Sequence, residues 1–228
     1  MRSEFDVVEI VPKSAPRYSV IWLHGLGADG HDFENIVPEL GLSDEYGIHF
    51  VFPNAPARPV TVNDGMVMRG WYDVRDMSLE RNVDIEGIYR SSEVIMELMR
   101  SEVDCGVVSE NILLAGFSQG GVIALHAGLR FGHKLAGILA LSCYLPTLDL
   151  LKKERSTVNN ATPILMAHGI WDTVVPLGSG KAAYERLKAM QYPIKWREYP
   201  MGHELCLEEL EHIANFIKNC FNSSESDA

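Results

Sequence analysis

The sequence lacks the patterns that mark metal-dependent proteins. Its 228 residues include four cysteines but no C-x-x-C pair. No H-E-x-x-H motif accompanies the cluster of His24, Asp29, His31 and Asp32. Structural zinc sites and zinc proteases usually carry such motifs. We therefore expect no metal site at this cluster.

Long apolar runs and clusters of positive charge are also missing. The most apolar segment, Leu135–Leu145, is much shorter than the roughly 18 residues that a membrane span needs. The N-terminal sequence has no apolar core of the secretory type. The net charge is −11, with no cluster of lysine or arginine that would attract phosphate backbones or anionic lipids. We expect a cytoplasmic protein with reduced cysteines, no nucleic-acid partner and no stable membrane insertion.

No internal repeat is visible, and no proline-rich or glycine-rich linker divides the chain. A hydrophobic content of 46% suits one domain with a substantial core. We expect a single domain over residues 1–221, followed by a polar and frayed C-terminal tail over residues 222–228.

Apolar segments alternate along the chain with segments of helical character. Near-continuous runs such as ILLA and GILALS are typical of strands buried on both faces. The alternation predicts an α/β fold, with a mostly parallel central sheet and helices on both faces. The expected strands are Asp6–Val11, Tyr18–Leu23, Ile48–Phe52, Asn111–Ala115, Gly137–Ser142, Ile164–Ala167 and Ile194–Tyr199. The expected helices are Asp84–Val103, Gln119–Arg130, Gly180–Met190 and Glu204–Phe221.

One segment, Asn54–Met77, fits neither pattern. It contains prolines, glycines and large apolar residues, and we predict a long loop with little regular structure. Long loops in compact domains are often functional, so its exposed-looking methionines and Trp71 are candidates to line a pocket. The alternative is that they fill the edge of the core.

The segment Gly116–Gly120 has the pattern G-x-S-x-G and directly follows the expected strand Asn111–Ala115. A serine on such a strand-to-helix turn is held in a strained backbone conformation. The turn brings its two flanking glycines too close together for side chains, and the helix N-terminus presents free N–H groups to negative charge. We predict that Ser118 is a nucleophile. The alternative is a glycine-rich turn that merely contains serine.

A serine nucleophile needs a hydrogen-bonded base that is oriented by a carboxylate. His203 follows the strand Ile194–Tyr199 in a short glycine-containing loop that can reach the nucleophile. The strongest rival is His168, at the end of a strand, for which we expect a structural role. The other downstream histidines are His126, His133 and His212.

The acid must come between the serine and the histidine on this type of fold. Asp172 lies in the loop after the strand Ile164–Ala167. Its rival, Asp149, lies further from the end of its strand, and an Asx turn or a helix cap is the alternative role for Asp172. Because Ser118, Asp172 and His203 each follow a different strand in the required order, we predict that they form a triad.

Together these motifs resemble the phospholipase/carboxylesterase family of α/β-hydrolases, which includes acyl-protein thioesterases. Phe33 stands where eukaryotic thioesterases of the family usually have tryptophan, and HGLGADGHDF and PVTVNDG resemble the bacterial carboxylesterase branch. The residues that carry the resemblance are His24–Gly30, Pro53–Pro56, Trp71–Asp73, Gly116–Gly121, His168–Gly169, Asp172, Val175–Pro176 and Gly202–His203.

The resemblance implies an α/β-hydrolase fold with Ser118 as nucleophile, His203 as base and Asp172 as orienting acid. It also implies an oxyanion hole formed by the backbone N–H groups of Leu26 and Gln119, and no cofactor. The implied reaction is hydrolysis of carboxylic esters with short to medium acyl chains, or of lysophospholipids. The alternatives are an acyl-protein thioesterase and an inactive hydrolase that serves as a binding module. A second copy of the chain is a candidate partner.

An apolar acyl pocket should accompany this chemistry. Three candidates, Met66, Met68 and Trp71, come from the expected loop. A fourth, Leu145, lies in a loop after the strand Gly137–Ser142.

The glycines of HGLGADG also match G-x-G-x-x-G, the dinucleotide-binding fingerprint. That fingerprint requires an acidic residue at the end of the next strand, but Ile48–Phe52 ends in Pro53 and Asn54. We therefore expect the glycines on either side of Leu26 to turn its N–H group toward Ser118.

Overall fold

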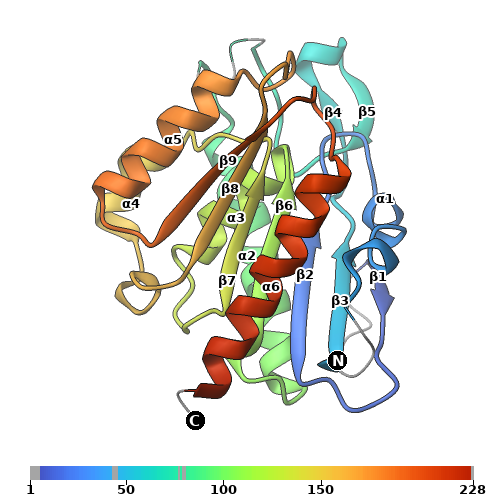
Figure 1. The fold of residues 1–228 in the computed structure, drawn as a ribbon. Coiled ribbons are helices and arrows are strands. Elements are labelled where there is room, and N and C mark those ends of the chain that lie inside the picture. Colours follow the sequence, from blue (N-terminus) through green and yellow to red (C-terminus); the bar gives the residue numbers. More distant parts are fainter. Residues whose placement is uncertain (1–5, 43–45, 77, 79–80, 227–228) are drawn as a thin grey trace.

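The centre of the molecule is a seven-stranded sheet (Figure 1). The structure is a computed structural model that describes residues 6–42, 46–76, 78 and 81–226. The strand order is β1-β3-β2-β6-β7-β8-β9, and only β1 runs antiparallel to its neighbour. The predicted fold class is confirmed. The strands are β1 (Val7–Ile10), β2 (Tyr18–Leu23), β3 (Ile48–Pro53), β6 (Ile112–Phe117), β7 (Gly137–Leu141), β8 (Ile164–Gly169) and β9 (Ile194–Tyr199).

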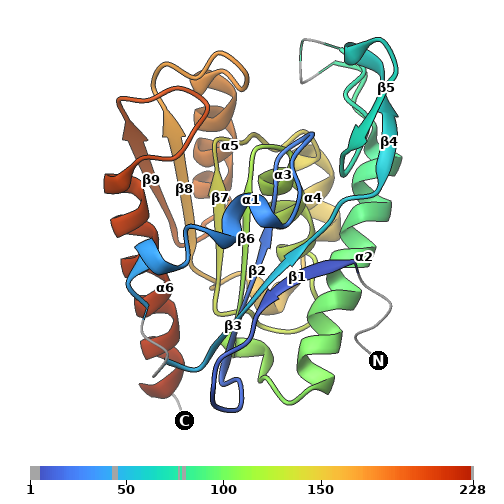
Figure 2. The same ribbon diagram turned by 90° about the vertical axis from the view of Figure 1, so that its right-hand side faces the viewer.

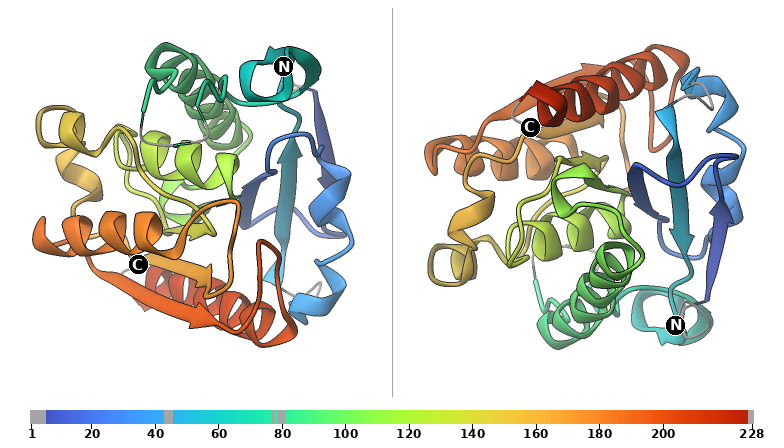
Figure 3. Two further views of the ribbon diagram at one scale, coloured as in Figure 1. Left: turned by 90° about the horizontal axis from the view of Figure 1, so that it is seen from above. Right: turned by 90° about the horizontal axis from the view of Figure 1, so that it is seen from below.

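Each face of the sheet packs against its own set of helices. In β6, Ile112 and Leu114 face one core, whereas Leu113 and Ala115 face the other, because successive side chains of a strand point to opposite faces. Figure 3 shows α6 on one side of the sheet and α2 and α3 on the other. The helices are α1 (His31–Glu34) and α6 (Leu207–Ser226) on one face, and α2 (Ile85–Asp104), α3 (Gln119–Gly128), α4 (Leu148–Glu154) and α5 (Leu177–Ala189) on the other.

Local sequence explains where the long helix α2 begins and which face it buries. The side chain of Asp84 accepts a hydrogen bond from the Gly87 N–H group at 3.2 Å, as an N-cap residue does. Ile88, Ile95 and Met99 recur at helical spacing and are fully buried. Four short 3-10 helices, Pro38–Leu40, Thr61–Asn63, Ser109–Asn111 and Thr157–Asn159, complete the regular structure of the described chain.

The prediction of a long loop with little regular structure over residues 54–77 is wrong. Strands β4 (Ala57–Val60) and β5 (Met66–Arg69) pair as an antiparallel hairpin. The turn before β5 contains Asp64 and Gly65 at φ 53° and 74°, in the left-handed region that these residue types tolerate best. Figure 2 shows the hairpin standing beyond the carboxyl ends of the central strands.

Helix α6 differs from its expected bounds. It begins at Leu207 and ends at Ser226, so residues 222–226 continue the helix where we expected a frayed tail. Residues 227–228 of that tail, Met77 of the expected loop and the first five residues lie outside the described residues. Within the described residues, no helix combines the length and apolar character that a membrane crossing requires.

Candidate active site

Ser118 lies on the turn between β6 and α3, in a backbone conformation that few residues other than glycine adopt. Its φ and ψ are 54° and −118°, and such conformations cost about 1–3 kcal/mol. A Cβ atom on Gly116 would lie 2.3 Å from the carbonyl oxygen of Gly120, and one on Gly120 would lie 2.4 Å from that of Leu23. Close backbone contacts therefore require both glycines of the motif.

Hydrogen bonds on both sides hold this strained turn in place. The Ser118 N–H group donates to the Leu141 carbonyl of β7 at 2.8 Å. The Ser118 carbonyl accepts from the Gly121 N–H group at 3.0 Å. The residue is 9% exposed, so the fold presents a restrained serine at the end of the sheet.

The structure brings Asp172 and His203 together. The Nδ1–H group of His203 donates to Oδ2 of Asp172 at 2.7 Å. The other carboxylate oxygen accepts from the N–H groups of Val174 and Val175, at 2.9 and 2.8 Å. The Asp172 side chain is fully buried. These two backbone donors fix the carboxylate so that its second oxygen faces the imidazole.

Direct backbone contacts tie the loops that carry these two residues to each other. The Ile170 N–H group donates to the Tyr199 carbonyl at 2.9 Å, and the Trp171 N–H group donates to the Met201 carbonyl at 3.0 Å. A Cβ atom on Gly169 would lie 2.1 Å from the Gly202 carbonyl oxygen. The distance between the acid and the base is therefore set by the backbone.

Phe117 connects the histidine to the serine turn. Its ring centroid lies 4.7 Å from that of His203, with the planes tilted by 45°. Among the hydrogen bonds of the described part of the chain, none joins the Ser118 hydroxyl to His203. Catalytic hydrogen bonds in free enzymes are often long and shorten only when substrate binds.

The loop that carries Leu26 lies beside the serine. A Cβ atom on Gly25 would be 3.5 Å from the Ser118 Cβ atom, so the loop after β2 runs against the nucleophile turn. Gly27 has a φ of 81°, which glycine adopts without steric cost. Within the described residues, the backbone N–H groups of Leu26 and Gln119 have no protein acceptor. Both are thus free to bind an anion.

The side chains of Gln119 and Trp71 join the N-terminus of α3 and the loop after β2 to the segment after the hairpin. Oε1 of Gln119 accepts from the Trp71 N–H group, and Nε2 donates to the Tyr72 carbonyl, both at 2.7 Å. The indole Nε1–H group of Trp71 donates to the His24 carbonyl at 2.9 Å. Trp71 therefore contacts both the helix that carries Gln119 and the loop that carries Leu26.

Further contacts hold the loop after β2. The Gly27 N–H group donates to the Arg69 carbonyl at 2.8 Å. The His24 ring donates to the Gly25 carbonyl through Nδ1 and accepts from the Ala55 N–H group through Nε2. Burial lowers the pKa of His24, and the use of both ring nitrogens leaves this residue no lone pair for a metal. In the part of the chain that the structure describes, no group of three or more His, Cys, Asp or Glu residues is placed to hold a metal ion.

Sequence comparison places these motifs in a known family. A sequence model of the phospholipase/carboxylesterase family matches residues 5–221. The chain belongs to this family. Its members are hydrolases, so the predicted family and enzyme class are confirmed. The resemblance to a bacterial branch stays a prediction.

Relatives of this hydrolase family match nearly the whole chain. Acyl-protein thioesterase 1 of Gibberella zeae is 40% identical over 211 residues, which cover 88% of this chain and 89% of the relative. Acyl-protein thioesterase 1 of Neurospora crassa is 41% identical over 209 residues, which cover 87% and 85%. The crystal structure of Arabidopsis thaliana SOBER1 is 31% identical, with a TM-score of 0.85 over 90% of this chain and 99% of that protein.

The rival histidine of this family member, His168, braces the acid loop. Its Nε2–H group donates to the Val175 carbonyl at 2.8 Å and lies 3.4 Å from Asp172 Oδ2. Burial lowers the pKa of His168. His168 is a buried imidazole whose ring N–H group is used in a hydrogen bond to a backbone carbonyl. This fits the structural role that we expected.

The remaining rivals have other partners. Burial lowers the pKa of His126 to about 3, and its ring bonds the Thr147 hydroxyl at 2.8 Å. His212 bonds the Tyr199 hydroxyl at 2.9 Å. Asp149 is exposed and forms an ion pair with a residue of α5. His133 lies against the ring of Phe131.

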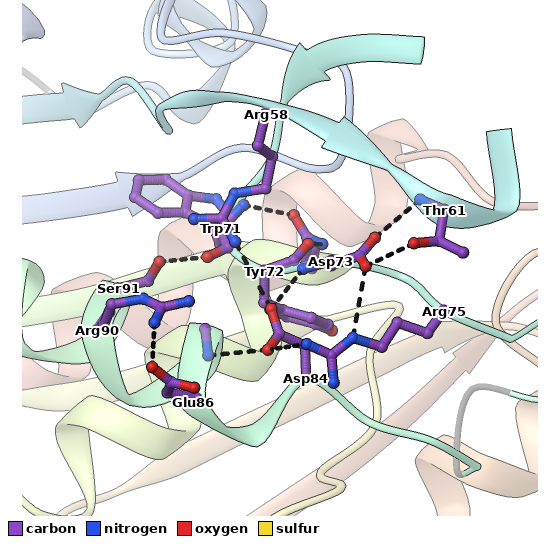
Figure 4. A network of polar contacts seen from close by, with 12 residues as sticks. Arg58, Thr61, Trp71, Tyr72, Asp73, Arg75, Asp84, Glu86, Arg90 and Ser91 are labelled. Carbon is purple, nitrogen blue, oxygen red and sulfur yellow. Dashed lines mark hydrogen bonds and ion pairs between the residues drawn. The ribbon is translucent and has the colours of Figure 1, made fainter. Parts of the chain in front are cut away.

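Trp71 does not have the exposed position that we expected. It is 2% exposed, so it fills the edge of the core, which was the alternative interpretation. Figure 4 shows that its carbonyl accepts from the Ser91 hydroxyl of α2.

Asp84, at the start of α2, accepts from the Asp73 N–H group at 3.0 Å and from Arg75 at 2.8 Å. This network anchors the segment after the hairpin to α2.

The other pocket candidates differ in exposure and surroundings. Met66 is 64% exposed on the hairpin. Met68 is half-buried, and its sulfur lies 3.7 Å from where a Cβ atom on Gly27 would stand. Leu145 is buried and lines a separate cavity of about 250 Å³, together with Tyr144 and residues of α4 and α5. Met68 is thus the candidate that lies beside the loop after β2.

Proposed function

We propose that this family member is a serine hydrolase that cleaves carboxylic esters and S-acyl thioesters. Ser118 is the nucleophile, His203 the base and Asp172 the orienting acid. The observation that carries the proposal is the 2.7 Å hydrogen bond between His203 and the fully buried Asp172. It occurs beside a serine that hydrogen bonds hold at positive φ.

The first half of the reaction forms an acyl-enzyme. Asp172 accepts a hydrogen bond from the Nδ1–H group of His203, which keeps that proton on Nδ1 and leaves the Nε2 lone pair free to take the proton of the Ser118 hydroxyl. The serine oxygen attacks the acyl carbonyl carbon, and the carbonyl electron pair moves onto oxygen. The N–H groups of Leu26 and Gln119 stabilise this oxyanion, and loss of one such donor typically costs about 3–4 kcal/mol.

The second half releases the acyl group. The carbonyl re-forms as the bond to the leaving oxygen or sulfur breaks, and His203 Nε2–H protonates that leaving group. A water molecule then gives a proton to His203 and attacks the acyl-serine. Collapse of this second intermediate breaks the bond to the Ser118 oxygen, which takes the proton from His203 Nε2, and releases the carboxylic acid. Every proton transfer uses a group that this chain supplies.

Two sequence relatives favour thioesters on proteins as one substrate class. The Gibberella zeae and Neurospora crassa proteins are named acyl-protein thioesterases and are 40% and 41% identical to this chain. An ester and a thioester present the same carbonyl carbon to Ser118 and differ in the leaving atom. One oxyanion hole therefore serves both substrates.

Hydrolysis of a substrate panel tests the proposal. The panel consists of p-nitrophenyl esters, lysophospholipids and acyl thioesters of graded chain length. The Ser118→Ala variant should lose about a millionfold in kcat. Ser142→Ala is the matched control, because Ser142 is also buried at positive φ directly after a strand.

The control should hydrolyse the panel as the wild type does, and thermal unfolding should show that both variants fold. Wild-type rates in Ser118→Ala would refute the proposed nucleophile. A wild-type protein that hydrolyses no member of the panel would instead favour the binding-module alternative.

A further inference from the structure

A groove of about 670 Å³ lies between the edge strand β9 and helix α6. Residues of β8, β9, α5 and α6 line it. Figure 1 shows β9 at the edge of the sheet, with α6 next to it on one face. The volume lies in the range of known small-molecule sites, roughly 300–1,000 Å³. The groove is therefore large enough for a ligand.

The pattern of β9 explains why the groove exists. Ile194 and Trp196 pack against the core on the α5 side of the sheet. Lys195 and Arg197 alternate with them, line the groove and are exposed. The inner strands carry apolar residues on both faces. On the α6 side of β9, the positions that are apolar in the inner strands are occupied by Lys195 and Arg197. These charged side chains do not pack against α6 as apolar side chains do, and a groove remains.

The groove is lined by positively charged side chains, although the protein as a whole carries a net negative charge. Lys188 of α5 adds a third cation to its wall, and none of the described residues that line it is acidic. The whole chain has 31 Asp and Glu residues against 20 Lys and Arg residues. Within the described chain, Lys195 and Arg197 form no ion pair. Unpaired cations that converge on a concave surface attract an anion.

The floor of the groove is apolar. Leu165 of β8 and Phe216 and Cys220 of α6 line it and are buried. An apolar floor below a cationic rim suits a molecule with one alkyl chain and one anionic head. The planar guanidinium of Arg197 matches a carboxylate or phosphate with two parallel hydrogen bonds.

We propose that this groove binds an anionic amphiphile with a single alkyl chain. The chain lies on Leu165, Phe216 and Cys220, and the carboxylate or phosphate head contacts Arg197 and Lys195. The site lies on the α6 face of the sheet, whereas the proposed catalytic residues lie in loops at the carboxyl ends of the strands. Its binding is therefore independent of the proposed ester hydrolysis.

Calorimetric titration of the full chain tests this site. The ligands are dodecanoate, dodecyl phosphate and the neutral dodecanol, each below its aggregation concentration. We expect the anions to bind, and dodecanol to bind about tenfold or more weakly, because it lacks the charge-assisted hydrogen bonds. A preference for dodecanoate or for dodecyl phosphate identifies the head group.

Four variants locate the binding. Arg197→Gln and Lys195→Gln should each weaken anion binding about tenfold. Asn215→Trp should block the groove, because the exposed Asn215 lines it and the larger ring fills it without a change of charge. Lys153→Gln is the control, because Lys153 is exposed on α4 and has no ion pair in the described chain.

The control variant should bind as the wild type does, and circular dichroism should show that all four variants fold. Absence of binding to the wild type would overturn the proposal. Wild-type affinity in Arg197→Gln and Asn215→Trp would overturn it as well, because the ligand would then bind elsewhere. Ester hydrolysis by the groove variants should be unchanged.

Discussion

Trp71 links the two halves of the proposed oxyanion hole, and Trp71→Phe removes its contact with the half that carries Leu26. The change removes the Nε1–H group that donates to the His24 carbonyl at 2.9 Å, but keeps an aromatic ring in the core. The phenylalanine of the variant should keep the backbone contact with Gln119, because that hydrogen bond uses the main-chain N–H group of residue 71. The loop that carries Leu26 therefore loses its support, whereas the Gln119 side loses little.

The size of the effect follows from these contacts. Leaving the buried His24 carbonyl without a donor costs about 1–3 kcal/mol of stability. A displacement of about 1 Å at a catalytic group can lower the rate about 100-fold. Complete loss of one oxyanion donor sets the limit, at about 100- to 1,000-fold in kcat. We expect kcat to fall about 10- to 100-fold, with KM nearly unchanged, because oxyanion contacts strengthen mainly in the transition state.

Steady-state hydrolysis of p-nitrophenyl esters of graded length measures this effect. Trp196→Phe is the control, because it removes an indole donor, 2.7 Å from Glu198, on the edge strand away from the oxyanion loops. Unchanged kcat in a folded Trp71→Phe protein would refute the supporting role. A changed chain-length preference would instead favour Trp71 as a pocket residue.

Three further predictions concern stability. Ser118→Gly should raise Tm by about 2–4 °C in calorimetry, because it relieves about 1 kcal/mol of strain, whereas Ser118→Ala should not. Gly120→Ala should destabilise the fold by about 1–3 kcal/mol in urea, because its Cβ would meet the Leu23 carbonyl, whereas Gly132→Ala, with open space around it, should not. Burial raises the pKa of Glu209 from 4.5 to about 8, so the native protein keeps a proton that the unfolded chain releases, and stability falls as the pH rises through about 8. Urea unfolding of Glu209→Gln should therefore show a stability advantage over the wild type that grows from about pH 5 to about pH 9.

The sheet could be predicted because its strands bury both faces. The runs in β6 and β7 leave no polar side that would suggest another structure. The positions of Ser118, Asp172 and His203 followed from one topological fact, namely that the carboxyl ends of parallel strands meet at one edge. Their order along the chain then matched the order of the loops.

The hairpin was missed although a local signal was present. Asp64-Gly65 is a dipeptide typical of tight hairpin turns, and both residues have positive φ. The strands on the two sides of this turn show no apolar alternation, because β4 contains Pro59 and β5 exposes Met66 and Val67. The sequence pattern therefore did not predict them. Short exposed strands owe their structure to pairing more than to propensity.

The support of the oxyanion hole had no signal in the sequence. Gln119 bonds the backbone at Trp71 and Tyr72, 48 and 47 residues away along the chain, respectively. A carboxamide that pairs with a distant main chain leaves no spacing pattern to detect. The groove was hidden for a similar reason, since the alternating cations of β9 acquire meaning only when β9 becomes the edge strand beside α6.

The proposed mechanism requires that Ser118 alone among the serines is activated. Labelling of the native chain with a fluorophosphonate, followed by mass spectrometry of the digested protein, tests it most directly. We expect a single phosphonylated peptide that contains Ser118, and loss of that label when His203 is replaced by alanine. A label on another residue, or no label on a folded protein, would contradict it.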